Sequence, residues 1–244
     1  MKILGIIPAR YASTRFPGKP LADIAGKSMI RRVYEQAMQA QKLTEVVVAT
    51  DDVRILAHVN DFGGKAVLTS PDHQSGTDRC AEVADKLPGY DYAVNIQGDE
   101  PFIHPGQIDL LCSCFNDKDT VLATLVKQIH SDDDLINPNI PKVVLNSHSE
   151  AIYFSRTVIP HYRGKPLTEW LSYQTYFKHI GIYGYRTDIL NTITQLPISV
   201  LEIAEALEQL RWIENGFQIK VAITDRETHA VDTPEDLEKI LKNL

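Results

Sequence analysis

Short apolar runs alternate with longer stretches of helical periodicity along the first third of the chain. The runs and the periodic stretches that follow them are residues 3–8 and 28–41, 45–49 and 52–62, and 66–68 and 76–87. Strands that alternate with helices in this way form a parallel sheet with helices on both faces. A fourth apolar run at 92–96 ends at a polar break, and ligands of open α/β sheets bind at this carboxyl edge of the strands.

The alternation breaks at about residue 131 and resumes near residue 178. Beyond the break the sequence predicts a strand at 178–185, a helix at 201–214 with an apolar stripe of Ala204, Leu207 and Leu210, a strand at 220–223, and a last helix that begins at Pro234. No internal repeat, low-complexity tract or polar linker divides the chain. We therefore expect one domain over residues 1–244, with an inserted lobe or arm at about 131–178.

The charge of the chain limits its partners. Its 25 Lys and Arg residues face 32 Asp and Glu residues, a net charge of -7 that repels nucleic acid and anionic membranes. A polyanionic ligand must therefore bind in a local basic pocket. No apolar run reaches the ~20 residues that span a bilayer, and Cys80, Cys112 and Cys114 form no CxxC pair. We expect a cytoplasmic protein that binds neither nucleic acid nor membrane.

The loop after the first predicted strand, residues 8–20, is rich in groups that bind phosphate. It carries three cations and two small hydroxyl residues: Arg10, Arg15, Lys19, Ser13 and Thr14. Guanidinium, ammonium and backbone amide groups at the carboxyl edge of a parallel sheet suit a triphosphate. The alternative, a solvated loop whose cations cluster by chance, fits the composition equally well, and the position at the first strand end favours binding.

Two familiar nucleotide-binding loops are excluded by spacing. Gly26-Lys27-Ser28 resembles the end of a GxxxxGKS loop, but Leu21 stands where the first glycine must be. No GxGxxG pattern follows a predicted strand, which disfavours an NAD-dependent dehydrogenase. Gly26-Lys27-Ser28 is better explained as a turn and helix start.

Carboxylates follow the fourth predicted strand directly, at Asp99 and Glu100. Mg²⁺ in proteins takes one or two carboxylates together with substrate phosphates. Asp232 comes shortly after another predicted strand and can converge on the same edge. The ordinary alternative for Asp232-Thr233-Pro234 is a capped helix start, with Pro at the first helical position, and both descriptions can hold together.

Two further polar sets are candidates for substrate contacts. In the segment 72–79, Gln74 can present an amide to a base edge and Gly76 permits close backbone approach, although a glycine turn capped by Thr77 explains the spacing slightly better. The second set lies in the second half of the chain and contains Arg156, His179, Tyr183, Glu208 and Gln209. Each of these residues has an ordinary structural explanation, but together they could bind a polyhydroxylated acid, with Arg156 or His179 on its carboxylate.

These segments together resemble the 3-deoxy-manno-octulosonate (Kdo) cytidylyltransferase family, the CMP-Kdo synthetases of Gram-negative bacteria. The matching segments are IIPARYASTRFPGKPL (6–21), VVVATDD (46–52), DHQSGTDR (72–79), VNIQGDEP (94–101), YFSR (153–156), KHIGIYGYR (178–186), LEQLR (207–211) and VDTPEDLEK (231–239). The resemblance covers essentially the whole chain. It implies a nucleotide-diphospho-sugar transferase (Rossmann-like) fold with a mixed, mostly parallel sheet, and a Mg²⁺-dependent homodimer that couples CTP to Kdo with release of pyrophosphate for lipopolysaccharide synthesis.

The resemblance also assigns roles residue by residue. The residues implied to bind CTP are Arg10, Ser13, Arg15, Lys19, Gln74, Ser75, Gly76 and Gln97. The residues implied to bind the sugar acid are Gln97, Arg156, His179, Tyr183, Glu208 and Gln209. Asp99 and Asp232 are the implied magnesium ligands, and with Arg10, Arg15 and Lys19 they form the implied catalytic set.

The chain departs from this family in two places. Residues 226–230 replace a glycine-containing turn of many relatives, and residues 162–175, in the presumed dimerisation arm, match no family pattern. Alternatives to the implied activity are the same reaction on 8-amino-Kdo or a sialic acid, and a catalytically inactive nucleotide-binding regulator. Retention of both Asp99 and Asp232 argues against the inactive regulator.

Overall fold

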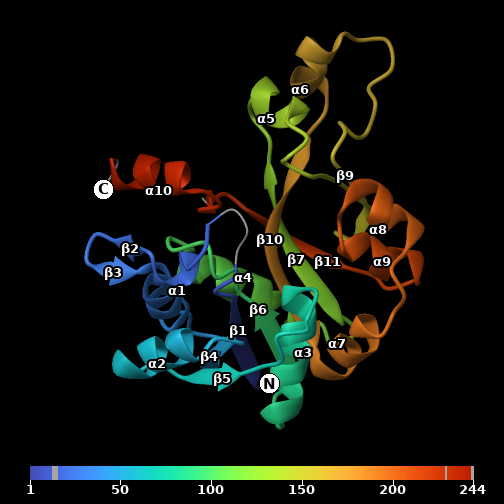
Figure 1. Ribbon diagram of the computed structural model, residues 1–244. Helices are drawn as coiled ribbons and strands as arrows, with labels where there is room; N and C mark the ends of the chain where they lie inside the picture. Colours follow the sequence, from blue (N-terminus) through green and yellow to red (C-terminus); the bar gives the residue numbers. More distant parts are fainter. Residues whose placement is uncertain (13–15, 229, 243–244) are drawn as a thin grey trace.

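A single mixed sheet forms the centre of the molecule. The computed structural model describes residues 1–12, 16–228 and 230–242 (Figure 1). Within these residues the sheet contains β1 (Ile3–Ala9), β4 (Glu45–Thr50), β5 (Ala66–Leu68), β6 (Tyr92–Asn95), β7 (Leu122–Gln128), β8 (Lys142–Leu145), β9 (Ala151–Ser155), β10 (Phe177–Arg186) and β11 (Lys220–Thr224). The main strand order is β11-β7-β10-β6-β1-β4-β5, and β8 and β9 are attached to β10.

Most neighbouring strands of the main order are parallel. The exception is β10, which runs antiparallel to both β6 and β7. The predicted mixed, mostly parallel sheet is therefore confirmed. Side chains of β1 alternate between the two faces of the sheet and contribute to two apolar cores. Ile3 and Ile7 belong to the core on one face, and Leu4 and Ile6 belong to the core on the other.

Helices cover both of these faces, as predicted (Figure 1). Residues of α1 (Met29–Ala37), α2 (Val53–Asp61) and α4 (Pro105–Ser113) belong to the first core. Residues of α3 (Gly76–Lys86), α7 (Thr187–Thr194) and α9 (Gln209–Glu214) belong to the second. The last helix, α10 (Pro234–Leu241), packs near the small hairpin of β2 (Asp23–Ile24) and β3 (Lys27–Ser28).

An arm projects from the body between β7 and β10, at the top of Figure 1. It carries α5 (Asp132–Ile136), a 3-10 turn η3 (Leu167–Glu169) and α6 (Trp170–Tyr173). A small apolar cluster of its own, with Leu135, Trp170 and Tyr176, holds the arm together. A role of this arm in dimerisation stays a prediction.

The predicted helix at 201–214 is wrong as one element. It consists of α8 (Val200–Glu205) and α9, separated by Ala206 in a left-handed conformation with φ of 50°. The Arg156 guanidinium donates to the carbonyls of Glu205 and Ala206 at 2.6 and 3.2 Å, which stabilises the end of α8. Ala204 is consequently exposed, whereas Leu207 and Leu210 are buried as expected.

Of two predicted helix caps, the cap of α3 needs correction and the cap of α10 is confirmed. Ser75, not Thr77, caps α3, because its side chain accepts from the Asp78 amide in a capping box. Thr233 caps α10 with Pro234 in the first turn, as the sequence predicts. No described helix is long and apolar enough to cross a membrane.

Candidate active site

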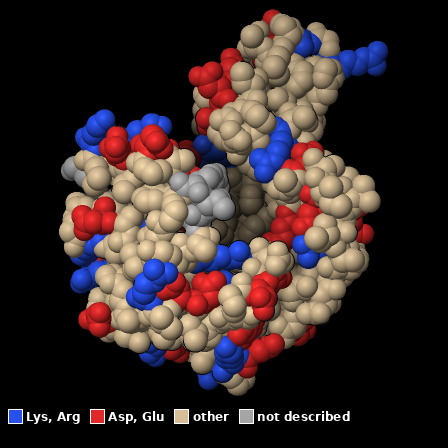
Figure 2. Space-filling view, viewed as in Figure 1, with Lys and Arg blue, Asp and Glu red and all other residues tan. Residues whose placement is uncertain are grey.

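The carboxyl ends of β1 and β6 meet at one edge of the sheet. A Cβ atom on Gly98 would lie 2.5 Å from the carbonyl oxygen of Pro8. Only glycine permits so close an approach, which places Asp99 beside the loop that follows β1. Figure 2 shows that the surface is hollowed between this region and the arm, with charged side chains of both signs around the hollow.

Lys19 joins the two carboxylates that the sequence places on this edge. Its Nζ atom lies 2.8 Å from Asp99 Oδ2 and 3.5 Å from Asp232 Oδ1. Gly18, with φ of 72°, provides the turn that precedes Lys19. The amide of Val231 donates to the Asp99 carbonyl at 2.9 Å and attaches the C-terminal segment to the end of β6. Residues far apart in the sequence thus converge at one point.

The donor set at this point fits a magnesium ion. Asp99 and Asp232 offer hard carboxylate oxygens, and the Lys19 ammonium beside them already places a positive charge there. In the part of the chain that the structure describes, no group of three or more His, Cys, Asp or Glu side chains is arranged for a metal. Two carboxylates completed by substrate phosphates is the arrangement typical of Mg²⁺.

A hollow of about 520 Å³ lies between this edge and the base of the arm. Glu100, Lys178, His179 and Glu227 are among its lining residues. Burial, together with the charge of Asp99, raises the pKa of Glu100 to about 8. Lys178 bridges Asp134 of the arm and Glu227 at 2.9 and 3.0 Å, so ion pairs join the arm, β10 and the segment that leads to Asp232.

The candidate nucleotide segment lies at the start of α3, next to the end of β1. A Cβ on Gly76 would lie 3.5 Å from both Pro8 Cγ and Asn95 Nδ2, so this glycine adjoins the first and fourth predicted strands. Gln74 is exposed, and its side-chain amide donates to the Asp72 carbonyl at 2.8 Å. Ser75 is held by the capping box.

The same segment is braced by Glu82. Burial raises the pKa of Glu82, but hydrogen bonds from Lys86, the Ser70 amide and His73 outweigh burial and lower this pKa to about 2. The Glu82 carboxylate is therefore ionised at neutral pH, and it fixes the chain on both sides of Asp72.

The other residues predicted to contact nucleotide are placed only in part. Arg10 is half-buried at the end of β1, and its charge contributes to lowering the pKa of Arg79, which burial lowers most. Gln97 is half-buried, and its Cγ atom would lie 3.9 Å from a Cβ on Gly181 of β10. Ser13 and Arg15 lie outside the described residues.

The candidate acid-binding residues come from β10 and the start of α9. The rings of His179 and Tyr183 lie 5.1 Å apart, and His179 Nε2 lies 3.0 Å from Thr124 Oγ1. Burial lowers the pKa of His179, so the imidazole is neutral at pH 7 and offers no charge to a carboxylate. Glu208 accepts a hydrogen bond from the Thr77 hydroxyl at 2.7 Å. His179 and Tyr183 therefore belong to β10, and Glu208 and Gln209 belong to the start of α9.

The Arg156 guanidinium is directed at backbone carbonyls rather than at His179 and Tyr183. It donates to the carbonyls of Glu205, Ala206 and Pro138. Contact of Arg156 with a ligand carboxylate thus stays a prediction.

Sequence reasoning missed two buried polar residues, Asn95 of β6 and Tyr185 of β10, which lie near the predicted Tyr183. Among the described residues, Asn95 Oδ1, Tyr183 OH, Tyr185 OH and Gln209 Nε2 are buried without a well-formed hydrogen bond. Such orphaned groups are rare in folded proteins and mark sites that a ligand or water satisfies. Asn95 and Tyr185 lie in largely apolar strands. The only sequence signal for them is a polar side chain at a position that the strand pattern places inside the protein.

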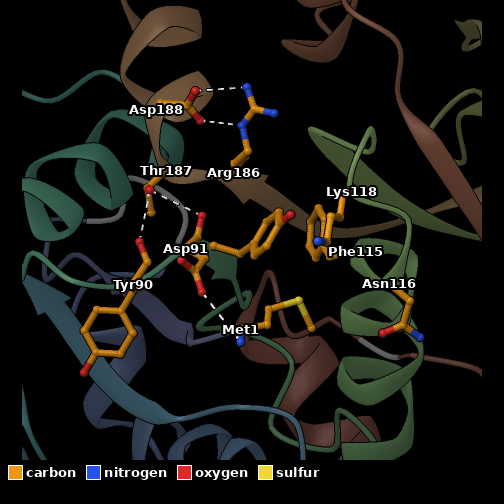
Figure 3. Close-up of a pocket in the computed structure, with 10 residues that line it drawn as sticks. Met1, Tyr90, Asp91, Phe115, Asn116, Lys118, Arg186, Thr187 and Asp188 are labelled. Carbon is orange, nitrogen blue, oxygen red and sulfur yellow. Dashed lines mark hydrogen bonds and ion pairs between the residues drawn. The ribbon is translucent and has the colours of Figure 1, made fainter.

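A larger hollow, of about 700 Å³, lies at the opposite edge of the sheet (Figure 3). The Tyr92 and Phe115 rings stack at 4.2 Å in its wall, and Arg186 pairs with Asp188 at 2.7 Å. None of the predicted site residues lines it. Its volume alone therefore does not make it the reaction site.

The fold and the carboxyl-edge constellation define a nucleotidyl-transferring enzyme class, and the comparisons with known proteins agree. The family model described as "Cytidylyltransferase" matches residues 4–223, and the chain belongs to this family. It is 62% identical to the 3-deoxy-manno-octulosonate cytidylyltransferase of Parabacteroides distasonis, over 99% of this chain and 97% of the relative. The enzyme of the same name from Bacteroides thetaiotaomicron is 58% identical over 100% and 99% of the two chains.

A solved structure supports the same assignment. It is described as CMP:2-keto-3-deoxy-manno-octonic acid synthetase complexed with CTP, and it superimposes with a TM-score of 0.93 at 45% identity, over 100% of this chain and 98% of its own. The predicted family resemblance and the predicted fold are confirmed.

Proposed function

We propose that this protein transfers CMP from CTP to the anomeric hydroxyl of Kdo, with release of pyrophosphate, and so provides CMP-Kdo for lipopolysaccharide synthesis. One observation carries the proposal: Lys19, Asp99 and Asp232 converge at the carboxyl edge of a sheet that matches the CTP-bound synthetase closely. The names of the full-length relatives supply the sugar acid.

The nucleotide occupies the loop after β1 and the segment before α3 in this proposal. Arg10, Arg15, Lys19 and Ser13 bind its phosphates, since guanidinium and ammonium groups match phosphate oxygens. The cytosine and ribose lie against Gln74, Ser75 and Gly76, and Gln97 lies at the junction of the two substrates. Gly76 leaves room for this approach because it carries no side chain.

Asp99 and Asp232 would hold Mg²⁺. When bound, this ion supplies Lewis-acid stabilisation of phosphate charge and lowers the pKa of a nearby hydroxyl. The support from the protein is the pair of carboxylates and the Lys19 ammonium between them.

The reaction is an in-line attack of the anomeric oxygen on the α-phosphorus of CTP. The new bond is oxygen to α-phosphorus, the bond from α-phosphorus to the bridging oxygen of the β-phosphate breaks, and the hydroxyl proton is released. Positioning and charge neutralisation dominate such transfers. Lys19 and Arg15 stabilise the leaving pyrophosphate, while Arg156, His179, Tyr183, Glu208 and Gln209 orient the acid.

The assay is pyrophosphate release from CTP and Mg²⁺ with Kdo, with sialic acid or with 8-amino-Kdo, each with and without EDTA. We expect EDTA-sensitive release with Kdo alone. Release only with another acid would change the acceptor, and no release with any acid would refute the proposal in favour of an inactive nucleotide binder.

Two variants sharpen the assay. Asp99→Asn removes a carboxylate while keeping its shape, and removing one preorganised charged group costs about 10² to 10³ in rate. The exposed Asp119→Asn provides a matched control away from the edge. Near-normal turnover of Asp99→Asn would contradict the magnesium assignment.

The proposal extends to the state of the protein in the cell. We propose a cytoplasmic homodimer in which the arm contributes to the interface. Sedimentation velocity at micromolar concentration tests the dimer, and a single monomeric boundary would contradict it.

A further inference from the structure

A hydrogen bond joins the two candidate substrate sites directly. The Thr77 hydroxyl donates to Glu208 Oε2 at 2.7 Å, across 131 residues of sequence. Thr77 is 3% exposed, so water does not compete for this bond. It connects the first turn of α3 to the turn between α8 and α9.

The Thr77 end of this bond is fixed to the candidate nucleotide segment. Thr77 follows Gln74, Ser75 and Gly76 directly, and the capping box of Ser75 and Asp78 encloses it within the same turn. A nucleotide that orders this segment therefore also orders the Thr77 hydroxyl.

The Glu208 end lies among groups that lack partners. The Gln209 side-chain nitrogen and the Tyr183 hydroxyl are buried without a well-formed hydrogen bond among the described residues. Burial raises the pKa of Tyr183 most, and the nearby charges of Tyr185 and Glu208 raise it further, so Glu208 lies in the neighbourhood of this hydroxyl. A carboxylate has about four acceptor sites, and Thr77 and Ser75 use two of them. Glu208 thus keeps acceptor capacity for the hydroxyls of a bound sugar acid.

The backbone around Glu208 is held independently of Thr77. Arg156 donates to the carbonyls of Glu205 and Ala206, and Arg211 forms a two-pronged pair with Glu202 at 2.7 and 2.6 Å. Removal of the Thr77 hydroxyl therefore leaves the Glu208 carboxylate with the hydrogen bond from Ser75 alone, and its orientation is less fixed, while the turn that carries it stays in place.

We propose that Thr77 is a positioning residue that couples the acid site to the nucleotide site, by holding the Glu208 carboxylate in the orientation that accepts hydroxyls of the sugar acid. The proposal rests on the proposed function, because it needs both substrates. Coupling of this kind is reciprocal, so ordering of the nucleotide segment tightens acid binding and the reverse.

The test compares Thr77→Val, which keeps the shape and removes the hydroxyl, with Thr77→Ser, which keeps the hydroxyl. Steady-state pyrophosphate release gives kcat, the KM for the acid and the KM for CTP. A hydrogen bond to a charged group is worth about tenfold in affinity. We expect Thr77→Val to raise the KM for the acid about tenfold and the KM for CTP less than about threefold, and Thr77→Ser to restore both nearly to wild-type values.

Thr187→Val is the matched control. Its hydroxyl donates to the Tyr90 carbonyl at 3.1 Å, at the opposite edge of the sheet, so neither KM changes. A wild-type KM for the acid in Thr77→Val would refute the proposal, as would a defect that Thr77→Ser does not restore. If Thr77→Val does not fold, Thr77→Ala, which also lacks the hydroxyl, takes its place with the same expected and refuting results. An inactive wild-type protein would instead refute the proposed function.

Discussion

Gly98→Ala is expected to lower activity while the protein still folds. Gly98 lies just after β6 and contacts Pro8 of β1. Its added Cβ would lie 2.5 Å from the Pro8 carbonyl oxygen, whereas real Cβ contacts start near 3.0 Å and are common only beyond 3.4 Å. Either the segment that carries Gly98 or the segment that carries Pro8 must therefore move by about 0.5 to 0.9 Å, which is the difference between 2.5 Å and these two limits. The other contacts of this Cβ are looser, so the carbonyl decides the outcome.

The end of β6 is the part that moves. Pro8 belongs to β1, which pairs with β4 on one side and β6 on the other and lies in the middle of the sheet. Gln97, Gly98 and Asp99 lie beyond the last paired residues of β6, so fewer hydrogen bonds hold them. The displacement therefore reaches the Asp99 carboxylate. A misplacement near 1 Å costs up to about 10²-fold in rate, and crowding of a packed contact costs about 1 to 3 kcal/mol in unfolding free energy.

The measurements are kcat for pyrophosphate release and urea unfolding monitored by tryptophan fluorescence. Gly64→Ala is the matched control, since its Cβ would lie 2.6 Å from Phe62 Cε2, a crowded contact before β5 and away from this edge. We expect kcat to fall about 10- to 100-fold in Gly98→Ala and to stay within about twofold in Gly64→Ala. Wild-type turnover by a folded Gly98→Ala protein would refute the idea that this contact positions Asp99.

Three further predictions concern single side chains. Lys19→Ala should lower kcat about 10² to 10³-fold with an unchanged far-UV spectrum, while the exposed Lys118→Ala keeps wild-type turnover; equal rates in both would contradict a role for the Lys19 charge. The lowered pKa of Glu82, from 4.5 to about 2, means that its stabilising effect is present above about pH 4.5 and is lost as the pH falls through about 2. Glu82→Gln should therefore be destabilised by about 1 kcal/mol at pH 6 and by less at pH 3 in urea unfolding, and a difference that grows on acidification would show the opposite sign. Ala206→Gly should keep or raise the melting temperature, because a φ of 50° costs an alanine about 1 to 2 kcal/mol. Ala204→Gly, in the exposed face of α8, should lower the free energy of unfolding by about 1 kcal/mol. An equal loss of stability in both variants would disprove the strain at Ala206.

The sequence predicts the sheet well because periodicity and burial agree along its strands. The run that ends at Pro8 is apolar throughout, and the run that ends at Ile96 is apolar except for Asn95, as expected for strands buried on both faces. The helix at 201–214 is harder to predict, because apolar residues occur at helical spacing on both sides of Ala206. At the interruption the Ala206 carbonyl accepts a hydrogen bond from Arg156, a residue 50 positions away in sequence, which no local pattern indicates.

The site also contains residues that the sequence predicts and contacts that it does not. Asp99 and Lys19 are indicated by position, since both follow strands that end at one edge. The direction of the Arg156 guanidinium and the bond from Thr77 to Glu208 are tertiary facts, because they join elements that no local pattern brings together. The cap of α3, by contrast, has a local signal, because Ser75 is followed three residues later by Asp78 whereas Thr77 is followed by Cys80.

The antiparallel direction of β10 has a consequence for how enzymes with this sheet can diverge. Gln128 at the end of β7 is the direct partner of Phe177 at the start of β10, so the chain leaves and re-enters the sheet at adjacent positions. Residues 129–176 therefore form the connection of one β-hairpin, and within this connection β8 and β9 are attached to β10. The parts that carry α5, η3 and α6 lie outside the sheet, so insertions and replacements can alter them without a new crossover. Lys19, Asp99 and Thr77 lie outside this connection, so the end of the arm can change beside an unchanged candidate nucleotide site.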